Sequence, residues 1–357
     1  MAQTCPYLLN PPLKKNMYFK KDNKIGVKQM CTTFSIQTKD GNNFVGRNLD
    51  LAYNVNECPI ILPRNYLLED KVTGNMQTTD KALIGIGTVI DDHPSLVDAM
   101  NENGLVCAGL NFEGFAHFEE KPVPGKTNIT PYDFIYWVVS NYDTINEVKS
   151  ALSNIDLVDV PLNDQTPVPT LHWMITDKTG RSIVVEKTKE QLAVFDNPVG
   201  VMTNQPTFDW HLMNLNRYIS INPNQPEPVK WSDQLLQIHG VGAGTLGLPG
   251  DSHSVSRFVR IAYARAHMPV LEDDISAVTQ CMHMLDYVKM VKAGVLTEGM
   301  VEKTTYSACM DQQNGIYYYK NYGNSRINAV NMHKEDLDGD ELIKCHYLTT
   351  QDINYQN

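Results

Sequence analysis

Residues 30–51 read MCTTFSIQTKDGNNFVGRNLDL, a stretch that predicts a β-hairpin. Residues 31–38 are rich in β-branched side chains, and residues 44–47 read as the returning strand. Between them, Asp40-Gly41 is a turn signal typical of a two-residue hairpin connection. The chain is therefore expected to fold around this hairpin.

The hairpin is also expected to gather three reactive groups. A two-residue turn places Asp50 opposite Cys31, with Arg47 close by on the same strand as Asp50. Arg47 and Asp50 have opposite parity, so a regular strand sends their side chains to opposite faces. Both reach Cys31 only if the strand bulges or ends near Asn48.

Cys31 has two interpretations. A cysteine in a strand is usually a small buried hydrophobe. Cys31, however, directly follows Met30, so translation from Met30 and removal of that methionine would make Cys31 the first residue. An α-amine titrates at about 7.7–8.0, close enough to neutrality to accept the thiol proton. Arg47 would then stabilise the thiolate, which favours a nucleophile.

The segment before Cys31 is predicted to lie outside the catalytic domain. Residues 1–30 lack the apolar stretch of a secretory signal and are rich in lysine and asparagine, so we expect loose order. Residues 25–27 (IGV) can be encoded by ATA-GGA-GTA, which contains a bacterial ribosome-binding sequence ahead of Met30. A start at Met30 is preferred, with a propeptide as the alternative. Residues 31–357 are expected to form one catalytic domain.

Period-two and helical patterns alternate along the rest of the chain. Further strands are predicted over residues 60–62, 82–90, 105–111, 170–175, 182–186, 304–310, 315–319 and 326–330. Helices are predicted over residues 133–141, 145–152, 208–218, 254–266 and 275–288. Strands bracket helices at both ends, with no repeat or linker, which indicates one α+β domain with helices on antiparallel sheets.

Composition excludes several classes of function. The 357 residues carry 30 Lys and Arg against 41 Asp and Glu, a formal net charge of −11, which argues against nucleic acid and anionic lipid as partners. No apolar run approaches the roughly 18 residues of a membrane-spanning helix. Seven scattered cysteines form no CxxC pair, so a reducing cytoplasm is the expected location.

Three short motifs are read as structural. Residues 242–247 match GxGxxG, but Pro249 follows at once and prevents the helix that a dinucleotide site needs, so a loop is expected. Residues 336–341 are acidic like a calcium-binding loop, but their glycine is not at the position that such a loop requires, so a surface turn is expected. The ten histidines show no HExxH pattern, and no metal site is predicted. Residues 128–130 spell a glycosylation sequon that an unexported chain would not use.

Motifs spread over the whole chain from Met30 onward resemble the choloylglycine hydrolase family, which contains bile salt hydrolases and penicillin V acylases. Residues 1–29 lie outside the family pattern. The matching motifs, in order, are residues 30–33 (MCTT), 46–50 (GRNLD), 63–66 (PRNY), 101–105 (NENGL), 108–111 (AGLN), 171–174 (LHWM), 203–208 (TNQPTF), 248–251 (LPGD), 256–258 (SRF) and 315–319 (GIYYY).

The resemblance implies a set of site residues: Cys31, Arg47, Asp50, Asn111, Asn204 and Arg257. Cys31 would be the nucleophile, its own α-amine the general base, and Asp50 would hold that amine. The two arginines would lower the pKa of the thiol and orient the site. The two asparagines would donate hydrogen bonds to the oxyanion formed when the thiol attacks an amide carbonyl.

The resemblance further implies the four-layer αββα sandwich of N-terminal-nucleophile hydrolases, a homotetramer, and hydrolysis through a thioester acyl-enzyme without a cofactor. The implied substrates are small molecules, namely bile acids conjugated to glycine or taurine. Asn111 favours this substrate, because penicillin V acylases more often carry tyrosine there. The glycine-rich loop at residues 240–242 resembles that of enzymes preferring glycine conjugates.

Two alternatives stay open. The chain is a penicillin V acylase or another N-acyl amide hydrolase if its acyl pocket suits a different group. If residues 1–29 stay attached, Cys31 has no free amine, and the protein is an inert precursor or binds bile acids without turnover.

Overall fold

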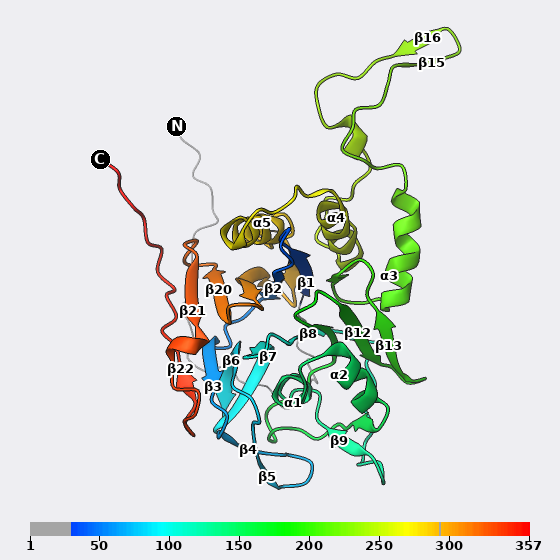
Figure 1. The fold of residues 1–357 in the computed structure, drawn as a ribbon. Helices are drawn as coiled ribbons and strands as arrows, with labels where there is room; N and C mark the ends of the chain where they lie inside the picture. Colours follow the sequence, from blue (N-terminus) through cyan, green and yellow to red (C-terminus); the bar gives the residue numbers. More distant parts are fainter. Residues whose placement is uncertain (1–29, 293) are drawn as a thin grey trace, which may run out of the picture.

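The computed structural model describes residues 30–292 and 294–357. Of the predicted extra N-terminal segment, residues 1–29 lie outside the described residues. Two large antiparallel sheets face one another, and helices cover the outer side of each sheet (Figure 1). The predicted α+β class and four-layer αββα sandwich are therefore confirmed.

The first sheet has six strands and begins with the hairpin of residues 30–51. In spatial order the strands are β14 (Val201–Met202), β1 (Met30–Gln37), β2 (Asn43–Leu51), β19 (Lys303–Asp311), β20 (Ile316–Asn321) and β21 (Asn328–Asn331). All nine residues of β2 are buried, because β2 is a central strand with a layer on each face.

The second sheet has eight strands. In spatial order they are β13 (Leu192–Asp196), β12 (Ser182–Lys187), β11 (Leu171–Thr176), β8 (Val106–Asn111), β7 (His93–Asn101), β6 (Leu83–Ile90), β3 (Cys58–Leu62) and β22 (Ile343–Lys344). β1 of the first sheet packs against β8 of the second, which brings the hairpin next to this sheet.

The outer layers are two pairs of helices. α4 (Ser254–His267) and α5 (Asp274–Asp286) pack on the six-stranded sheet. α1 (Phe134–Asn141) packs on β7 and β8, and α2 (Ile145–Leu152) follows it with a Thr144–Glu147 capping box. One core cluster lies between the sheets and under α4 and α5, and a second lies between the eight-stranded sheet and α1 and α2. None of the helices in the described ranges is long and apolar enough to cross a membrane.

An arm of residues 219–248 extends away from the body after α3 (Phe208–Leu215) and the 3-10 turn η1 (Asn216–Tyr218) (Figure 1). The predicted loop at residues 242–247 lies on this arm, so that prediction is confirmed. The remaining short elements are β4 (Leu67–Glu69), β5 (Met76–Thr78), β9 (Thr127–Ile129), β10 (Ile155–Leu157), β15 (Val229–Trp231), β16 (Gln234–Leu236), η2 (Ala243–Thr245), β17 (Leu296–Thr297), β18 (Met300–Val301) and η3 (Met332–Lys334).

The predicted register of the β1–β2 hairpin is wrong by one position. The Thr38 N–H donates to the Asn42 carbonyl, so three residues form the loop instead of two. The Gly41 N–H also donates to the Thr38 carbonyl, and Gly41 has a φ of 91°, the pattern of a turn followed by a left-handed glycine. Cys31 therefore stands opposite Leu49, not opposite Asp50.

Candidate active site

Cys31 is the second residue of β1, and its side chain points toward the second sheet. Directly paired residues of an antiparallel ladder share a face, so Cys31, Leu49 and Arg47 lie on the same side of the β1–β2 pair. Cys31 belongs to the core between the sheets and is buried. Burial raises the pKa of the Cys31 thiol, and the nearby Arg47 guanidinium opposes that shift.

Arg47 crosses from the first sheet to the second. Its Nη2 lies 3.6 Å from the Cys31 sulfur and donates to the Gly109 carbonyl of β8 at 2.8 Å. Its Nη1 donates to Asp98 Oδ2 of β7 at 2.9 Å and also to the Val97 carbonyl. Arg47 and Asp98 are both fully buried. The structure thus places the Arg47 guanidinium beside the Cys31 thiol.

Arg257 approaches the same residue from the helix side. It lies in the first turn of α4, and its Nη1 donates to the Cys31 carbonyl and, at 2.7 Å, to Thr32 Oγ1. Its Nη2 donates to Asn204 Oδ1 at 2.7 Å. Arg257 thus holds the backbone of Cys31, whereas Arg47 approaches the sulfur.

The two candidate asparagines are brought together. Asn204 follows β14, and its Oδ1 accepts the Cys31 backbone N–H at 2.8 Å. Its Nδ2 donates to the carbonyl of Asn111, the last residue of β8, at 2.9 Å. The Asn111 side chain accepts from Thr170 Oγ1 at 2.9 Å. The Asn204 amide therefore contacts the Cys31 main chain directly, and Asn111 is joined to it through its backbone carbonyl.

Asp50 is on the other face of the hairpin. It pairs with Met30, and β1 and β2 stay in register without a bulge between them, so the predicted position opposite Cys31 is wrong. Asp50 Oδ1 accepts from Thr304 Oγ1 at 2.6 Å, while Oδ2 has no hydrogen-bond partner among the described residues. Burial raises the pKa of the Asp50 carboxyl to about 6, although Arg257 and Thr304 oppose the shift.

Sequence reasoning missed the residues that hold this cluster. The Asp98 carboxylate accepts from the hydroxyls of Tyr306 and Tyr317 as well as from Arg47, so it is fully engaged. A lone carboxylate inside the apolar run of β7 was the available signal, because such a group needs a buried cation. Thr304 gave no comparable signal, since its partnership with Asp50 joins distant parts of the chain.

The assembled groups suit acyl transfer. A guanidinium beside a thiol favours thiolate, and side-chain amides near the nucleophile can stabilise a developing oxyanion. The described residues contain no group of three His, Cys, Asp or Glu side chains placed to hold a metal ion.

Comparisons with known proteins agree with this geometry. Residues 31–345 match the family model described as linear amide C–N hydrolases, choloylglycine hydrolase family. A bile salt hydrolase/transferase of Clostridium perfringens is 46% identical over 92% of this chain and 100% of that relative. The solved structure of a mutant conjugated bile acid hydrolase from Clostridium perfringens has a TM-score of 0.87 at 45% identity, covering 92% of this chain and 100% of that one. A penicillin V acylase structure from Agrobacterium tumefaciens has a TM-score of 0.70 at 20% identity, covering 87% and 90%.

Proposed function

Because the chain belongs to the choloylglycine hydrolase family, we propose that it is a bile salt hydrolase that cleaves the amide bond of glycine- or taurine-conjugated bile acids. The observation that carries the proposal is the buried Cys31 thiol with the Arg47 guanidinium 3.6 Å from its sulfur. Cys31 is also the residue at which the family match begins.

The active chain, in this proposal, begins at Cys31. While Met30 is attached, the nitrogen of Cys31 is an amide N–H that donates to Asn204 and cannot accept a proton. Removal of residues 1–30, through a start at Met30 or through cleavage, converts it to an amine. Asp50 pairs with Met30, and its Oδ2 has no hydrogen-bond partner among residues 30–292 and 294–357. This supports a role for Asp50 as partner of that ammonium.

The first half of the reaction transfers the acyl group to sulfur. The α-amine takes the thiol proton, and the thiolate attacks the amide carbonyl carbon. Side-chain amides of Asn204 and Asn111 are the proposed donors to the oxyanion, each such donor contributing about 2.7–4 kcal/mol in comparable sites. When the C–N bond breaks, the ammonium returns its proton to the departing amine of glycine or taurine.

The second half regenerates the enzyme. Water gives a proton to the α-amine and attacks the thioester carbonyl, and the C–S bond breaks to release the bile acid and the thiol. An amine in place of water would give a new amide, which matches the word transferase in the relative's name. The route needs no cofactor.

A substrate panel tests the proposal. Glycocholate, taurocholate and penicillin V are offered to the chain that begins at Cys31, and free glycine, taurine or the penicillin nucleus is quantified. Rapid release from either bile salt is expected, with glycocholate preferred. Cleavage of penicillin V alone would favour the acylase alternative, for which the resemblance at 20% identity shows only a shared fold. Faster cleavage of taurocholate would contradict the glycine preference alone.

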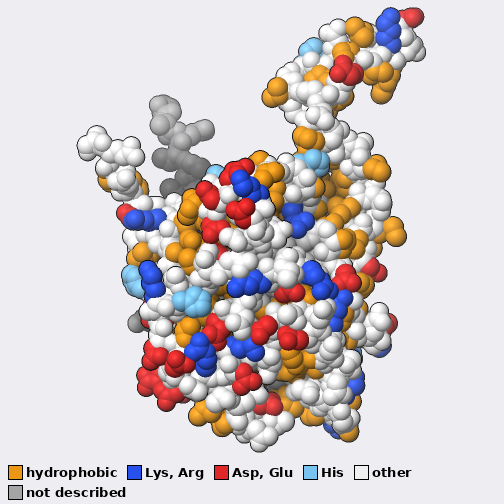
Figure 2. All heavy atoms as spheres, in the orientation of Figure 1, with side chains coloured by type: hydrophobic (Ala, Val, Ile, Leu, Met, Phe, Trp, Pro, Cys, Tyr) orange, Lys and Arg blue, Asp and Glu red, His pale blue; other side chains and the backbone are white. Residues whose placement is uncertain are grey.

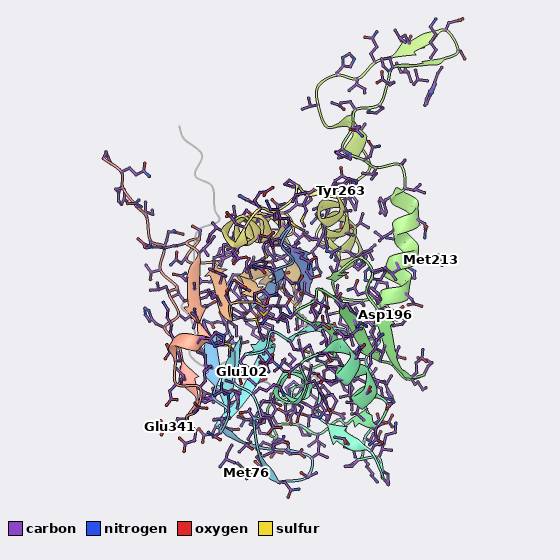
Figure 3. The ribbon with its side chains drawn as sticks, in the orientation of Figure 1. Met76, Glu102, Asp196, Met213, Tyr263 and Glu341 are labelled. Carbon is purple, nitrogen blue, oxygen red and sulfur yellow. The ribbon has the colours of Figure 1, made fainter. Side chains whose placement is uncertain are left out.

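We also propose a homotetramer located in the cytoplasm. The arm exposes large apolar side chains that water disfavours, including Ile219, Trp231 and Val241, at 89%, 71% and 97% exposure. Met213 is also exposed, on α3, the helix that precedes the arm (Figure 3), and Figure 2 shows apolar side chains along the arm. The six described cysteines are free thiols, which supports a reducing compartment. Mass measurement in solution and cell fractionation test the two claims.

A further inference from the structure

Two buried histidines donate to two consecutive backbone carbonyls beside the candidate site. His172 of β11 lies with Nε2 2.9 Å from the Thr203 carbonyl oxygen. His211 of α3 lies with Nε2 2.9 Å from the Asn204 carbonyl oxygen. Carbonyls only accept, so both rings carry a hydrogen on Nε2. The peptide that carries the Asn204 side chain is thus fixed at both ends by imidazoles.

The two rings differ in the partner of their Nδ1 atom. His211 Nδ1 has no hydrogen-bond partner in the described part of the chain, and burial lowers the pKa of His211 to about 4, so this ring is neutral. His172 Nδ1 instead lies 3.0 Å from Glu186 Oε1 of β12. The Phe208 N–H also donates to this carboxylate, at 3.1 and 3.2 Å to its two oxygens, which favours the anion. His172 and Glu186 therefore form a buried hydrogen-bonded pair.

The His172 ring is held by packing as well. It stacks on Phe112 with ring centroids 4.3 Å apart and planes inclined by 8°. Phe112 directly follows Asn111, whose carbonyl accepts from the Asn204 side chain. One ring thus touches the segments that carry both candidate oxyanion donors.

We propose that His172, held by Glu186, is a positioning residue for Asn204, an inference that rests on the proposed hydrolase function. Asn204 Oδ1 must face the Cys31 nitrogen and Arg257, and its Nδ2 must face the Asn111 carbonyl. The backbone direction at residues 203–204 sets that orientation. The Asn204 N–H of the same peptide donates to Ser254 Oγ at 3.0 Å, so His172 and Ser254 hold this peptide from its two sides. Without the His172 donor, only the Ser254 side is held, and the peptide is expected to tilt and shift the Asn204 amide.

His172→Phe tests the proposal in the chain that begins at Cys31. Phenylalanine keeps the ring stacked on Phe112 but removes both hydrogen bonds. For glycocholate, kcat is expected to fall about 100-fold, the cost of a misplaced group, with little change in KM. The rate at which iodoacetamide alkylates Cys31 is expected to stay unchanged, because Arg47 still lies beside the sulfur. His172→Gln, which restores a donor near the Nε2 position, is expected to recover part of kcat.

The matched control is His93→Phe. His93 is a second buried histidine, 2.6 Å from Asp133, and its hydrogen bonds involve none of the six candidate site residues. Both variants lose a buried His–carboxylate pair, but only His172→Phe is expected to lose kcat. A folded His172→Phe protein that keeps wild-type kcat would overturn the proposal. If it does not fold, Glu186→Gln replaces it, with a fall in kcat of about tenfold expected and an unchanged kcat overturning the proposal.

A second readout separates this inference from the hydrolase proposal. Hydrogen exchange at the backbone amides of residues 203–205 and 207 needs no substrate, and it is expected to accelerate in His172→Phe and not in His93→Phe. If the wild-type protein does not hydrolyse bile salts, the proposed function is rejected, and the positioning role of His172 is rejected with it. Faster exchange in His172→Phe would still show that His172 holds the backbone at residues 203–204. Equal exchange rates in His172→Phe and His93→Phe would show that His172 does not hold the backbone at residues 203–204.

Discussion

The Arg47 guanidinium lies between the Cys31 sulfur and the Asp98 carboxylate, so its position depends on a residue of the opposite sheet. Cys31 is buried, and burial alone raises the pKa of its thiol. The charge of Arg47 is the largest opposing influence on that pKa. At the scale of single residues, Asp98 is therefore expected to control reactivity without touching the sulfur.

Asp98→Asn is expected to weaken this control. Asparagine keeps the shape but leaves the buried Arg47 charge without its anionic partner, which costs about 3–5 kcal/mol of unfolding free energy. The alkylation rate of Cys31 should fall as the guanidinium loosens. Urea unfolding and iodoacetamide kinetics measure the two effects. Asp352→Asn is the control, because it breaks an exposed pair with Arg326 that is worth about 1 kcal/mol or less. Equal losses in both variants would contradict the role of Asp98.

Asp50 gives a pH-dependent prediction for the chain that retains Met30. Its pKa is about 6 in the folded chain, above the ordinary value of 3.8, so folding binds a proton between these values. Stability due to Asp50 is then fully present below about pH 4 and declines as pH rises to about 6, by about 3 kcal/mol.

The decline is measured as the unfolding free energy of wild type minus that of Asp50→Asn between pH 4 and pH 7. In the chain that begins at Cys31, the α-ammonium should favour the Asp50 carboxylate and reduce the decline. An identical decline in both chains would contradict the pairing of Asp50 with the amine.

At the scale of elements, local sequence patterns predicted the helices and most strands. Strand β7 and the register of the β1–β2 hairpin depend on contacts that those patterns do not contain. The predicted helix over residues 254–266 is observed as Ser254–His267, because its apolar spacing is read locally. Strand β7 was missed, since Pro94 and Asp98 interrupt its alternation and their environment comes from other strands. The hairpin register was wrong because Asp40-Gly41 suits two loop lengths, and only the bond between Thr38 and Asn42 distinguishes them.

Close strand packing makes Gly85 a testable position. A Cβ there would lie 2.1 Å from the backbone oxygen of Asp98, so alanine must push β6 away from β7. Gly85→Ala is expected to lower the unfolding free energy by about 2–3 kcal/mol. Gly250→Ala is the control, because nothing lies within 4 Å of its added Cβ. Denaturant titration compares them, and a Gly85→Ala protein as stable as Gly250→Ala would show that the strands are not packed as described.

At the scale of the whole molecule, the site lies where the two sheets meet. β1 and β2 supply Cys31 and Arg47, and the opposite sheet supplies Asn111 and Asp98. The hairpin pattern pointed to Cys31, Arg47 and Asp50, and family motifs added Asn111, Asn204 and Arg257. Their supporting residues come from contacts between the sheets that no local pattern encodes. The arm adds an apolar surface outside this arrangement (Figure 2).

Polar substitutions on the arm test its role in assembly. If the protein is the proposed tetramer, the triple variant Ile219→Ser, Trp231→Ser and Leu246→Ser is expected to shift it to smaller species, since it removes exposed apolar area from the arm. Light scattering after size-exclusion chromatography gives the mass. Leu67→Ser and Met76→Ser are controls, because these residues are also exposed, at 54% and 58%, and lie on the β4–β5 hairpin, far from the arm (Figure 1). A triple variant with unchanged mass would contradict the arm as interface.

The free α-amine of Cys31 is the central claim, and hydrolysis of glycocholate by two forms of the chain tests it most directly. One form begins at Cys31 and the other at Met1, and the intact mass of each is recorded in the assayed sample. The chain that begins at Cys31 should hydrolyse glycocholate, and the uncleaved chain should be slower by about 100-fold or more, the usual contribution of a positioned base. Comparable hydrolysis by a chain whose mass still includes residues 1–30 would contradict the account.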